Sequence, residues 1–124
     1  MNFSDLQQKI LAYCLDDEMG LWVIIREIYG FEYSHTDLLP AWVQEKALDE
    51  LKDLLSRGLV YIGQFDRIGD EYIFEIFPGN PEEIIQKVKR DWDALKTIPS
   101  LGDVCWIRST DKGDELARLL GLST

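Results

Sequence analysis

A long amphipathic segment that leads into two β-rich segments constrains the fold of this chain more than any other feature. The segment starts after Leu39-Pro40, because proline suits the first helical position and the residue before a proline avoids helical backbone angles. It ends at Gly58, which has the position of a left-handed cap. Between these ends, apolar residues recur at helical spacing: Val43, Ala47, Leu48, Leu51, Leu54 and Leu55. The pattern predicts a helix over residues 40–58.

The two segments that follow this helix have the composition of strands. Residues 59–65 and 72–77 are rich in β-branched and aromatic side chains, which favour extended backbone. The acidic residues 66–71 lie between them and include Gly69, which suits a turn. The predicted helix therefore continues directly into a β-hairpin.

Two helices are predicted before this segment. Ser4-Asp5-Leu6-Gln7 matches a capping box, and the apolar residues from Leu6 to Leu15 follow it at helical spacing. A second helix is expected to contain residues 21–25 and to end near Gly30. The carboxylates of Asp16-Asp17-Glu18 are expected to cap its start, where the helix dipole favours negative charge.

Three further elements are predicted after the hairpin. Asn80 as cap, Pro81 at the first position and Glu83 three residues after the cap indicate a helix over residues 81–95. Residues 104–107 have the pattern of a short buried strand. Thr110 and Asp111 are expected to cap a last helix that runs through Leu120.

The order of these elements predicts an α+β fold with about five helices and a small antiparallel sheet of about three strands. A chain of 124 residues with 46% apolar residues falls within the usual range of one domain. We find no repeat, no low-complexity tract and no linker in the sequence. We therefore expect a single domain over residues 1–124.

Residues 47–60, which read ALDELKDLLSRGLV and lead into the hairpin, resemble the winged-helix family. The resemblance covers about residues 4–77. Residues 106–116, WIRSTDKGDEL, are similar to the strand-to-helix step that often closes winged-helix regulators. The helix over residues 81–95 is an insertion relative to the simple family pattern. The resemblance implies a winged-helix-like domain whose third helix would enter the major groove of DNA.

The charge of the chain opposes nucleic-acid binding. The 23 acidic residues exceed the 13 basic ones, which gives a formal net charge of −10 and a pI of about 4.4. Proteins that bind duplex DNA gain most of their non-specific affinity from lysine and arginine contacts to phosphate. An acidic surface instead attracts basic partners.

The predicted binding surface is acidic with one aromatic residue. Trp22, Trp92 and Trp106 fall in core patterns, whereas Trp42 stands at a helix start near Phe31 and Tyr33, where we expect a partly exposed aromatic patch. Carboxylates dominate the outward positions of the third helix and the hairpin turn. The predicted partner-binding residues are Trp42, Glu45, Asp49, Glu50, Asp53, Asp66, Asp70 and Glu71.

No catalytic, cofactor or metal site is predicted. His35 is the single histidine, and its neighbours Ser34 and Asp37 do not by themselves provide the geometry of a catalytic triad. No phosphate-binding motif is present. The acidic clusters are interpreted as helix caps and turns, with adventitious cation binding as the alternative.

The location predicted from the sequence is cytoplasmic. The N-terminal residues lack the pattern of a signal peptide, and no apolar run is long enough to cross a membrane. Cys14 and Cys105 belong to no CxxC or comparable spacing. We expect both to be buried thiols, with a disulfide or a reactive cysteine as the alternative.

We therefore predict a non-enzymatic, acidic protein-binding module whose partner is a protein with a basic surface. An immunity or antidote protein that masks a basic nuclease toxin would be one instance. The alternative is a winged-helix DNA-binding transcriptional regulator, and a third hypothesis is an enzyme built on dispersed acids. The sequence determines neither the partner's identity nor the oligomeric state.

Overall fold

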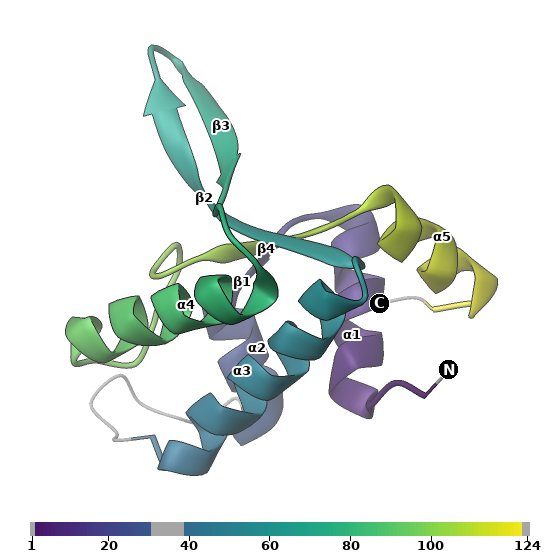
Figure 1. Ribbon diagram of the computed structural model, residues 1–124, viewed down its shortest axis with the longest axis horizontal. Coiled ribbons are helices and arrows are strands. Elements are labelled where there is room, and N and C mark those ends of the chain that lie inside the picture. The colour runs from purple at the N-terminus through teal and green to yellow at the C-terminus, as the bar shows by residue number, and fades with distance from the viewer. Residues whose placement is uncertain (1, 31–38, 123–124) are drawn as a thin grey trace.

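The computed structural model describes residues 2–30 and 39–122, and within these ranges the chain forms five helices and four strands. In chain order they are α1 (Asp5–Asp16), β1 (Met19–Gly20), α2 (Leu21–Tyr29), α3 (Ala41–Ser56), β2 (Val60–Ile68), β3 (Glu71–Ile76), α4 (Pro81–Leu95), β4 (Trp106–Ser109) and α5 (Asp111–Leu119). The fold is α+β, as the sequence predicts (Figure 1).

All four strands belong to one antiparallel sheet with the order β1-β4-β2-β3. Strand β2 changes partner along its length. From Val60 to Gly63 it pairs with β4, and from Gly63 to Ile68 it pairs with β3. The outer part of β2 and all of β3 therefore project from the rest of the molecule as a two-stranded hairpin (Figure 1).

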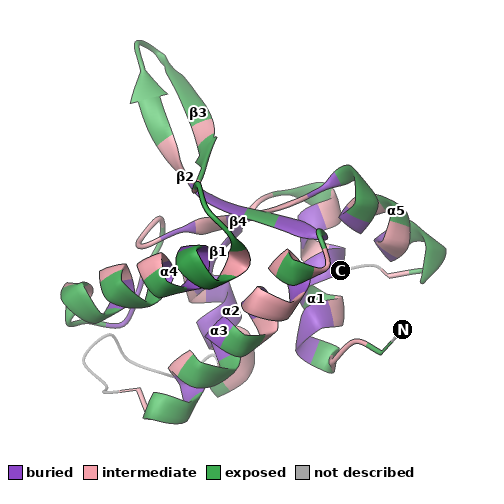
Figure 2. Ribbon diagram, viewed as in Figure 1, coloured by how far each residue is buried: buried purple, intermediate pink, exposed green. Residues whose placement is uncertain are grey.

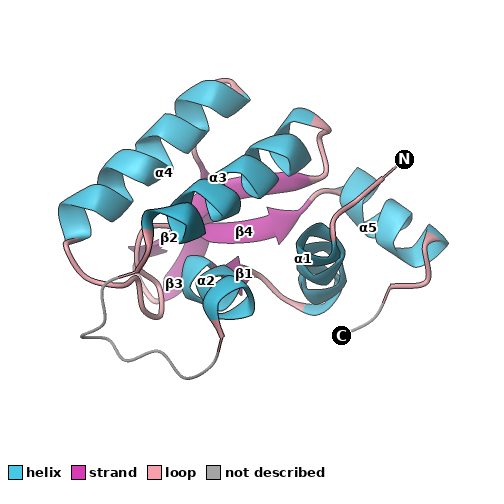
Figure 3. Ribbon diagram, turned by 90° about the horizontal axis from the view of Figure 1, so that it is seen from below, coloured by secondary structure: helices cyan, strands magenta, loops and turns pink. Residues whose placement is uncertain are grey.

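The helices cover one face of the inner sheet, and the core lies between them. In Figure 3, α2 and α3 cross in front of β4 and β2. Ile62 on β2 and Ile107 on β4 are fully buried on this face, and they belong to one cluster of buried side chains from the helices and the sheet. Figure 2 shows the contrast with the projecting hairpin, which is mostly exposed. The hairpin therefore contributes little to the core.

Local capping starts three of the helices as predicted. At α1, the amide of Gln7 donates to the Ser4 hydroxyl over 3.0 Å, and the Ser4 amide donates to the Gln7 side chain over 3.1 Å. Asn80 and Glu83 form the same reciprocal pair at α4, with distances of 2.9 and 3.0 Å. At α5, the Thr110 hydroxyl accepts from the Gly113 amide over 3.0 Å. Each box satisfies amides that have no partner within the helix.

The prediction that Asp16, Asp17 and Glu18 cap the second helix is wrong. Gly20 is the N-cap of α2 and makes no side-chain hydrogen bond there. Asp17 instead ends α1, and the Glu18 carboxylate accepts from Arg108 over 2.8 Å. The two-residue strand β1 separates these carboxylates from α2. A strand this short leaves no periodic signal in the sequence.

Several predicted boundaries also shift. Pro40 is the N-cap of α3 and not its first helical residue. The six-residue turn is shorter than predicted, because β2 continues to Ile68 and β3 starts at Glu71. The last strand starts at Trp106 and not at Val104, whose φ of 69° is incompatible with an extended strand.

The three tryptophans predicted as core anchors differ in burial. Trp92 is buried, and Trp22 is partly buried against the core. Trp106 is only partly buried and lies beside Ile107 on β4, so its side chain belongs to the opposite face of the sheet. Within the described ranges, no helix has both the length and the apolar character needed to cross a bilayer.

Candidate functional site

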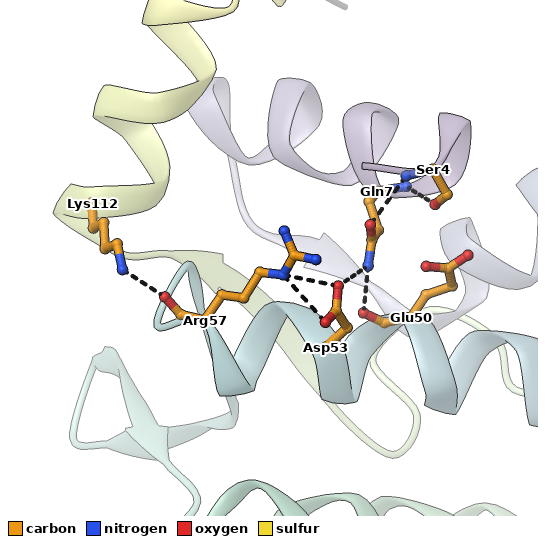
Figure 4. A network of polar contacts seen from close by, with 6 residues as sticks. All are labelled: Ser4, Gln7, Glu50, Asp53, Arg57 and Lys112. Carbon is orange, nitrogen blue, oxygen red and sulfur yellow. Dashed lines mark hydrogen bonds and ion pairs between the residues drawn. The ribbon is translucent and has the colours of Figure 1, made fainter. Parts of the chain in front are cut away.

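The four carboxylates predicted on α3 divide into two pairs. Glu45 and Asp49 are exposed. Asp53 accepts hydrogen bonds from Gln7 over 2.8 Å and from Arg57 over 3.2 Å, and the Glu50 carboxylate pairs with Lys46 at 3.4 Å. Figure 4 shows Gln7 reaching across from α1 to both Asp53 and the backbone carbonyl of Glu50. The carboxylates of Asp53 and Glu50 therefore already have partners within the molecule.

Helix α4 lies beside α3 and occupies much of its outer surface. The Gln44 side chain donates to Asp93 over 2.9 Å, and Lys52 forms an ion pair with Glu82. The two helices run side by side in Figures 1 and 3. With α1 also in contact with it, α3 keeps six exposed residues: Ala41, Trp42, Glu45, Lys46, Asp49 and Ser56.

Trp42 lies at the start of α3, far from the projecting hairpin in Figure 1. Its side chain is 52% exposed, and its ring centroid lies 6.5 Å from that of Tyr29. Trp42 and Lys46 border a hollow of about 350 Å³ between α1, α2 and α3. The exposed aromatic residue predicted here is confirmed, whereas Phe31, Tyr33 and His35 lie outside the described residues.

The remaining predicted residues, Asp66, Asp70 and Glu71, lie on the projecting hairpin. We call residues 64–76 the arm. All three side chains are exposed. The structure therefore does not unite the predicted site: Trp42, Glu45 and Asp49 lie on the helical body, and the other acids lie on the arm.

The register of the arm gives it one aromatic and one acidic face. Phe65 pairs with Phe74 and Arg67 pairs with Tyr72, which places these four side chains together because paired residues share a face of the sheet. The intervening pairs place Asp66 beside Ile73, Gln64 beside Glu75 and Ile68 beside Glu71 on the other face. We call this second face the acidic face.

The aromatic side of the arm continues onto the body of the sheet. The Phe65 ring lies 5.3 Å from Phe74 and 5.6 Å from Trp106, both edge to face. The Arg108 guanidinium lies 4.3 Å from the centre of the Phe74 ring. We call the whole surface the aromatic face: Tyr61, Phe65, Tyr72, Phe74, Ile76, Trp106 and the two arginines Arg67 and Arg108.

Gly63 is the residue at which the arm leaves the body. It pairs with Ile76 of β3 on one side and with Trp106 of β4 on the other. A Cβ atom at Gly63 would lie 2.1 Å from the backbone oxygen of Glu75, which is closer than any side chain allows. Only glycine therefore permits this close approach of the two strands.

The acidic face contains two carboxylates close enough to interact. The pKa of Glu75 is raised above its ordinary value, first by a side-chain hydrogen bond with Asp66 and then by the charge of the same group. Both side chains are exposed. Like charges so close together repel each other, and a cation from outside the molecule would relieve this repulsion.

The aromatic face was missed by the sequence reasoning. Its signal is the period-two pattern of Tyr61, Gly63, Phe65 and Arg67, matched by Tyr72, Phe74 and Ile76. The pattern assigns these residues to one face of the hairpin. It does not tell whether helices cover that face.

The cysteines do not have the properties of catalytic nucleophiles. Cys14 and Cys105 are free and buried, as predicted for structural thiols. Burial is the main cause that raises the pKa of each thiol to about 12, so both stay protonated near neutral pH. Among residues 2–30 and 39–122, no group of three or more histidine, cysteine, aspartate or glutamate side chains could hold a metal ion.

Comparison of the chain with protein-family models, with curated proteins and with solved structures gives no match in any of the three.

Proposed function

We propose that this protein is a non-enzymatic, winged-helix-like module that binds another protein through the arm, and that the partner has a basic surface. The observation that carries the proposal is the aromatic face, which is continuous from the arm to β4 and is backed by the acidic face. Aromatic residues and arginine are enriched in protein interfaces, where they supply most of the binding energy.

The exposure of the arm supports a role in binding. The side chains of Tyr72, Ile68 and Ile76 are 68%, 57% and 52% exposed. A two-stranded hairpin is only marginally stable by itself, and clustered exposed apolar side chains are unusual away from interaction sites. A partner that covered the arm would bury these side chains and stabilise the hairpin.

The charge distribution supports a basic partner. The net charge is −10, and the arm contains Asp66, Asp70, Glu71 and Glu75 against one arginine, Arg67. Opposite charge on a partner would accelerate association and disfavour acidic competitors. A basic nuclease toxin masked by an immunity or antidote protein is one instance of such a pair, in the cytoplasm where two free buried thiols are stable.

The alternative function, DNA binding by α3, has support from the order of the elements alone. Helix, strand, two helices and hairpin follow one another as in a winged helix. The exposed charged residues of α3 are Glu45, Lys46 and Asp49, and Lys46 already pairs with Glu50, so this surface lacks the basic phosphate contacts on which duplex binding depends. The surface chemistry therefore favours a protein partner.

Affinity capture tests the proposal. The full chain is immobilised and exposed at low salt to a lysate of its source cells, in parallel with the variants Tyr72→Ser and Leu119→Ser. Leu119 is an exposed apolar residue on α5 and serves as the matched control. We expect a basic protein to bind to the wild type and to Leu119→Ser and to be lost from Tyr72→Ser.

A salt titration with labelled duplex DNA of mixed sequence completes the test. Sub-micromolar binding that weakens steeply with salt would overturn the proposal in favour of DNA binding. Capture of no protein, or equal capture by all three chains, would also contradict it.

A further inference from the structure

The outer edge of β3 has unused backbone hydrogen-bonding groups. Strand β3 is the last strand in the sheet order, and among the described residues no strand pairs with its outer side. The Phe77 amide donates to the Ile62 carbonyl over 2.9 Å, next to the β2–β3 register. Hydrogen-bonded and non-hydrogen-bonded residue pairs alternate along an antiparallel ladder, and Phe77 belongs to a hydrogen-bonded pair. The N–H and C=O groups of Tyr72, Phe74 and Ile76 therefore point outward, away from β2.

Strand β3 lacks three features that commonly protect an exposed edge, and its charged side chains are those of Glu71 and Glu75. The six pairs from Gly63↔Ile76 to Ile68↔Glu71 are continuous and contain no bulge. The sequence of β3, EYIFEI, has no proline and no lysine. Proline, lysine and bulges are common devices against unwanted strand pairing. The edge is therefore available to an extended segment.

Charge disfavours a second copy of the chain at this edge. Antiparallel pairing of two β3 strands about Ile73 would place Glu71 of each copy opposite Glu75 of the other, next to Asp66. Like charges directly opposite each other destabilise a strand pair. Each copy also carries a net charge of −10.

We propose that β3 accepts an extended strand from the partner protein, in which apolar and basic side chains alternate. The inference rests on the proposed protein-binding function and specifies its partner. An added strand would place every second side chain beside Tyr72, Phe74 and Ile76 on the aromatic face, where apolar residues fit. The alternate side chains would lie beside Glu71, Ile73 and Glu75, and lysine or arginine fits beside the two glutamates.

The Asp66–Glu75 pair adds a reason for basic residues at those positions. Asp66 raises the pKa of Glu75, first through a side-chain hydrogen bond and then through its charge, so full ionisation of both side chains is disfavoured. A lysine or arginine of the added strand would stabilise both in their ionised forms. The two faces of the arm therefore favour a strand in which apolar and basic side chains alternate. The outward backbone groups of β3 would form the hydrogen bonds to that strand.

Synthetic peptides test the inference on the full chain. One peptide alternates valine and lysine over the length of β3, a second has the same composition in two blocks, and a third is the alternating peptide with every second amide N-methylated along one edge. We expect binding by the alternating peptide and a loss of about tenfold or more for the other two, because they lack either the alternation or the donors.

Two variants at one position separate backbone pairing from side-chain contact. Ile76→Ala and Ile76→Pro both remove the exposed side chain, and only proline also removes the outward N–H, which edge strands tolerate. We expect Ile76→Pro to bind the alternating peptide about tenfold more weakly than Ile76→Ala, with equal far-ultraviolet circular dichroism. Equal affinity of the two variants would overturn strand addition.

Charge reversal tests the choice of basic residues. Glu71→Lys with Glu75→Lys should lose the valine–lysine peptide and gain an alternating valine–glutamate peptide. Glu45→Lys with Asp49→Lys makes the same change in net charge on α3 and should keep the original preference. A single-stranded oligonucleotide that bound the wild type and not Tyr72→Ser would overturn the assignment to a protein strand.

These outcomes distinguish the inference from the proposed function. If the captured basic protein depends on Tyr72 while Ile76→Pro binds it as well as Ile76→Ala does, strand addition is wrong and protein binding by the aromatic face stands. If no arm variant affects capture, both are wrong.

Discussion

The Nε2 atom of Gln7 donates a hydrogen bond to the Oδ2 atom of Asp53 over 2.8 Å and joins the first turn of α1 to the last turn of α3. Gln7 is only 3% exposed, and its side chain also accepts from the Ser4 amide. One side chain therefore completes a helix cap and holds two helices together.

Replacement of Gln7 by alanine should destabilise the fold by about 1–3 kcal/mol, because it removes half of the capping box and one partly buried charge-assisted hydrogen bond. Urea unfolding measures the change. Gln8→Ala is the control, since the partly exposed Gln8 side chain contacts only the Phe3 carbonyl over 3.2 Å. Equal stability of the two variants would show that the contact with Asp53 contributes nothing.

Substitution at Gly63 should displace the arm. A Cβ atom there meets the Glu75 carbonyl at 2.1 Å, so Gly63→Ala must separate the strands at the point where β2 changes partner. Overpacking of this kind costs about 1–3 kcal/mol. Hydrogen exchange should become faster at the amides that bond across the arm, those of Gln64, Asp66, Ile73 and Glu75. Tyr61→Ala, at an exposed position of β2 outside the arm, should leave those amides protected. An unchanged exchange pattern in Gly63→Ala would contradict the close approach.

The acidic face should make the arm less stable as the pH rises. The pKa of Glu75 is raised by Asp66, so the folded arm binds more protons than the unfolded chain does between the ordinary and the raised pKa of Glu75. Stability falls with rising pH in that window because the folded state holds the extra proton. Asp66→Asn should return the pKa of Glu75 towards its ordinary value, as measured by a nuclear magnetic resonance titration of the Glu75 carboxyl group. Asp70→Asn should leave it raised.

Both cysteines should resist alkylation in the folded protein. Burial raises the pKa of Cys14 and of Cys105 to about 12, so the thiolate fraction at mildly alkaline pH is very small, and the sulfur atoms are also inaccessible. Mass spectrometry after iodoacetamide treatment should find no adduct under native conditions and two adducts in denaturant. Rapid modification of either residue in the native state would refute its structural role.

The helices were predictable because the signals that start them are local. The reciprocal contacts of Ser4 with Gln7 and of Asn80 with Glu83 span three residues each, and their geometry follows from the sequence alone. Strand β1 was not predictable, because Met19 and Gly20 become a strand only by pairing with Ile107 and Trp106. The same pairing left Asp16, Asp17 and Glu18 without the predicted capping role.

The candidate site was predictable in charge but not in arrangement. Glu50 and Asp53 occupy outward positions of α3 by periodicity, yet α1 lies close enough for Gln7 to use Asp53 and the Glu50 carbonyl. Helix α4 similarly engages Gln44. Neither contact has a signature within α3 itself.

The sequence by itself determined the N-caps of α1, α4 and α5, the hairpin, the acidic excess and the alternation of aromatic and acidic residues along the arm. These properties depend on neighbours within a few positions, or on composition. Only the tertiary structure decided that β4 occupies the inner part of β2 and that the arm extends beyond it, with Phe74 and Tyr72 on the face of the sheet opposite to the buried Ile62 and Ile107. The physical reason is that a period of two fixes which residues share a face, whereas the burial of that face depends on distant segments that pack against it.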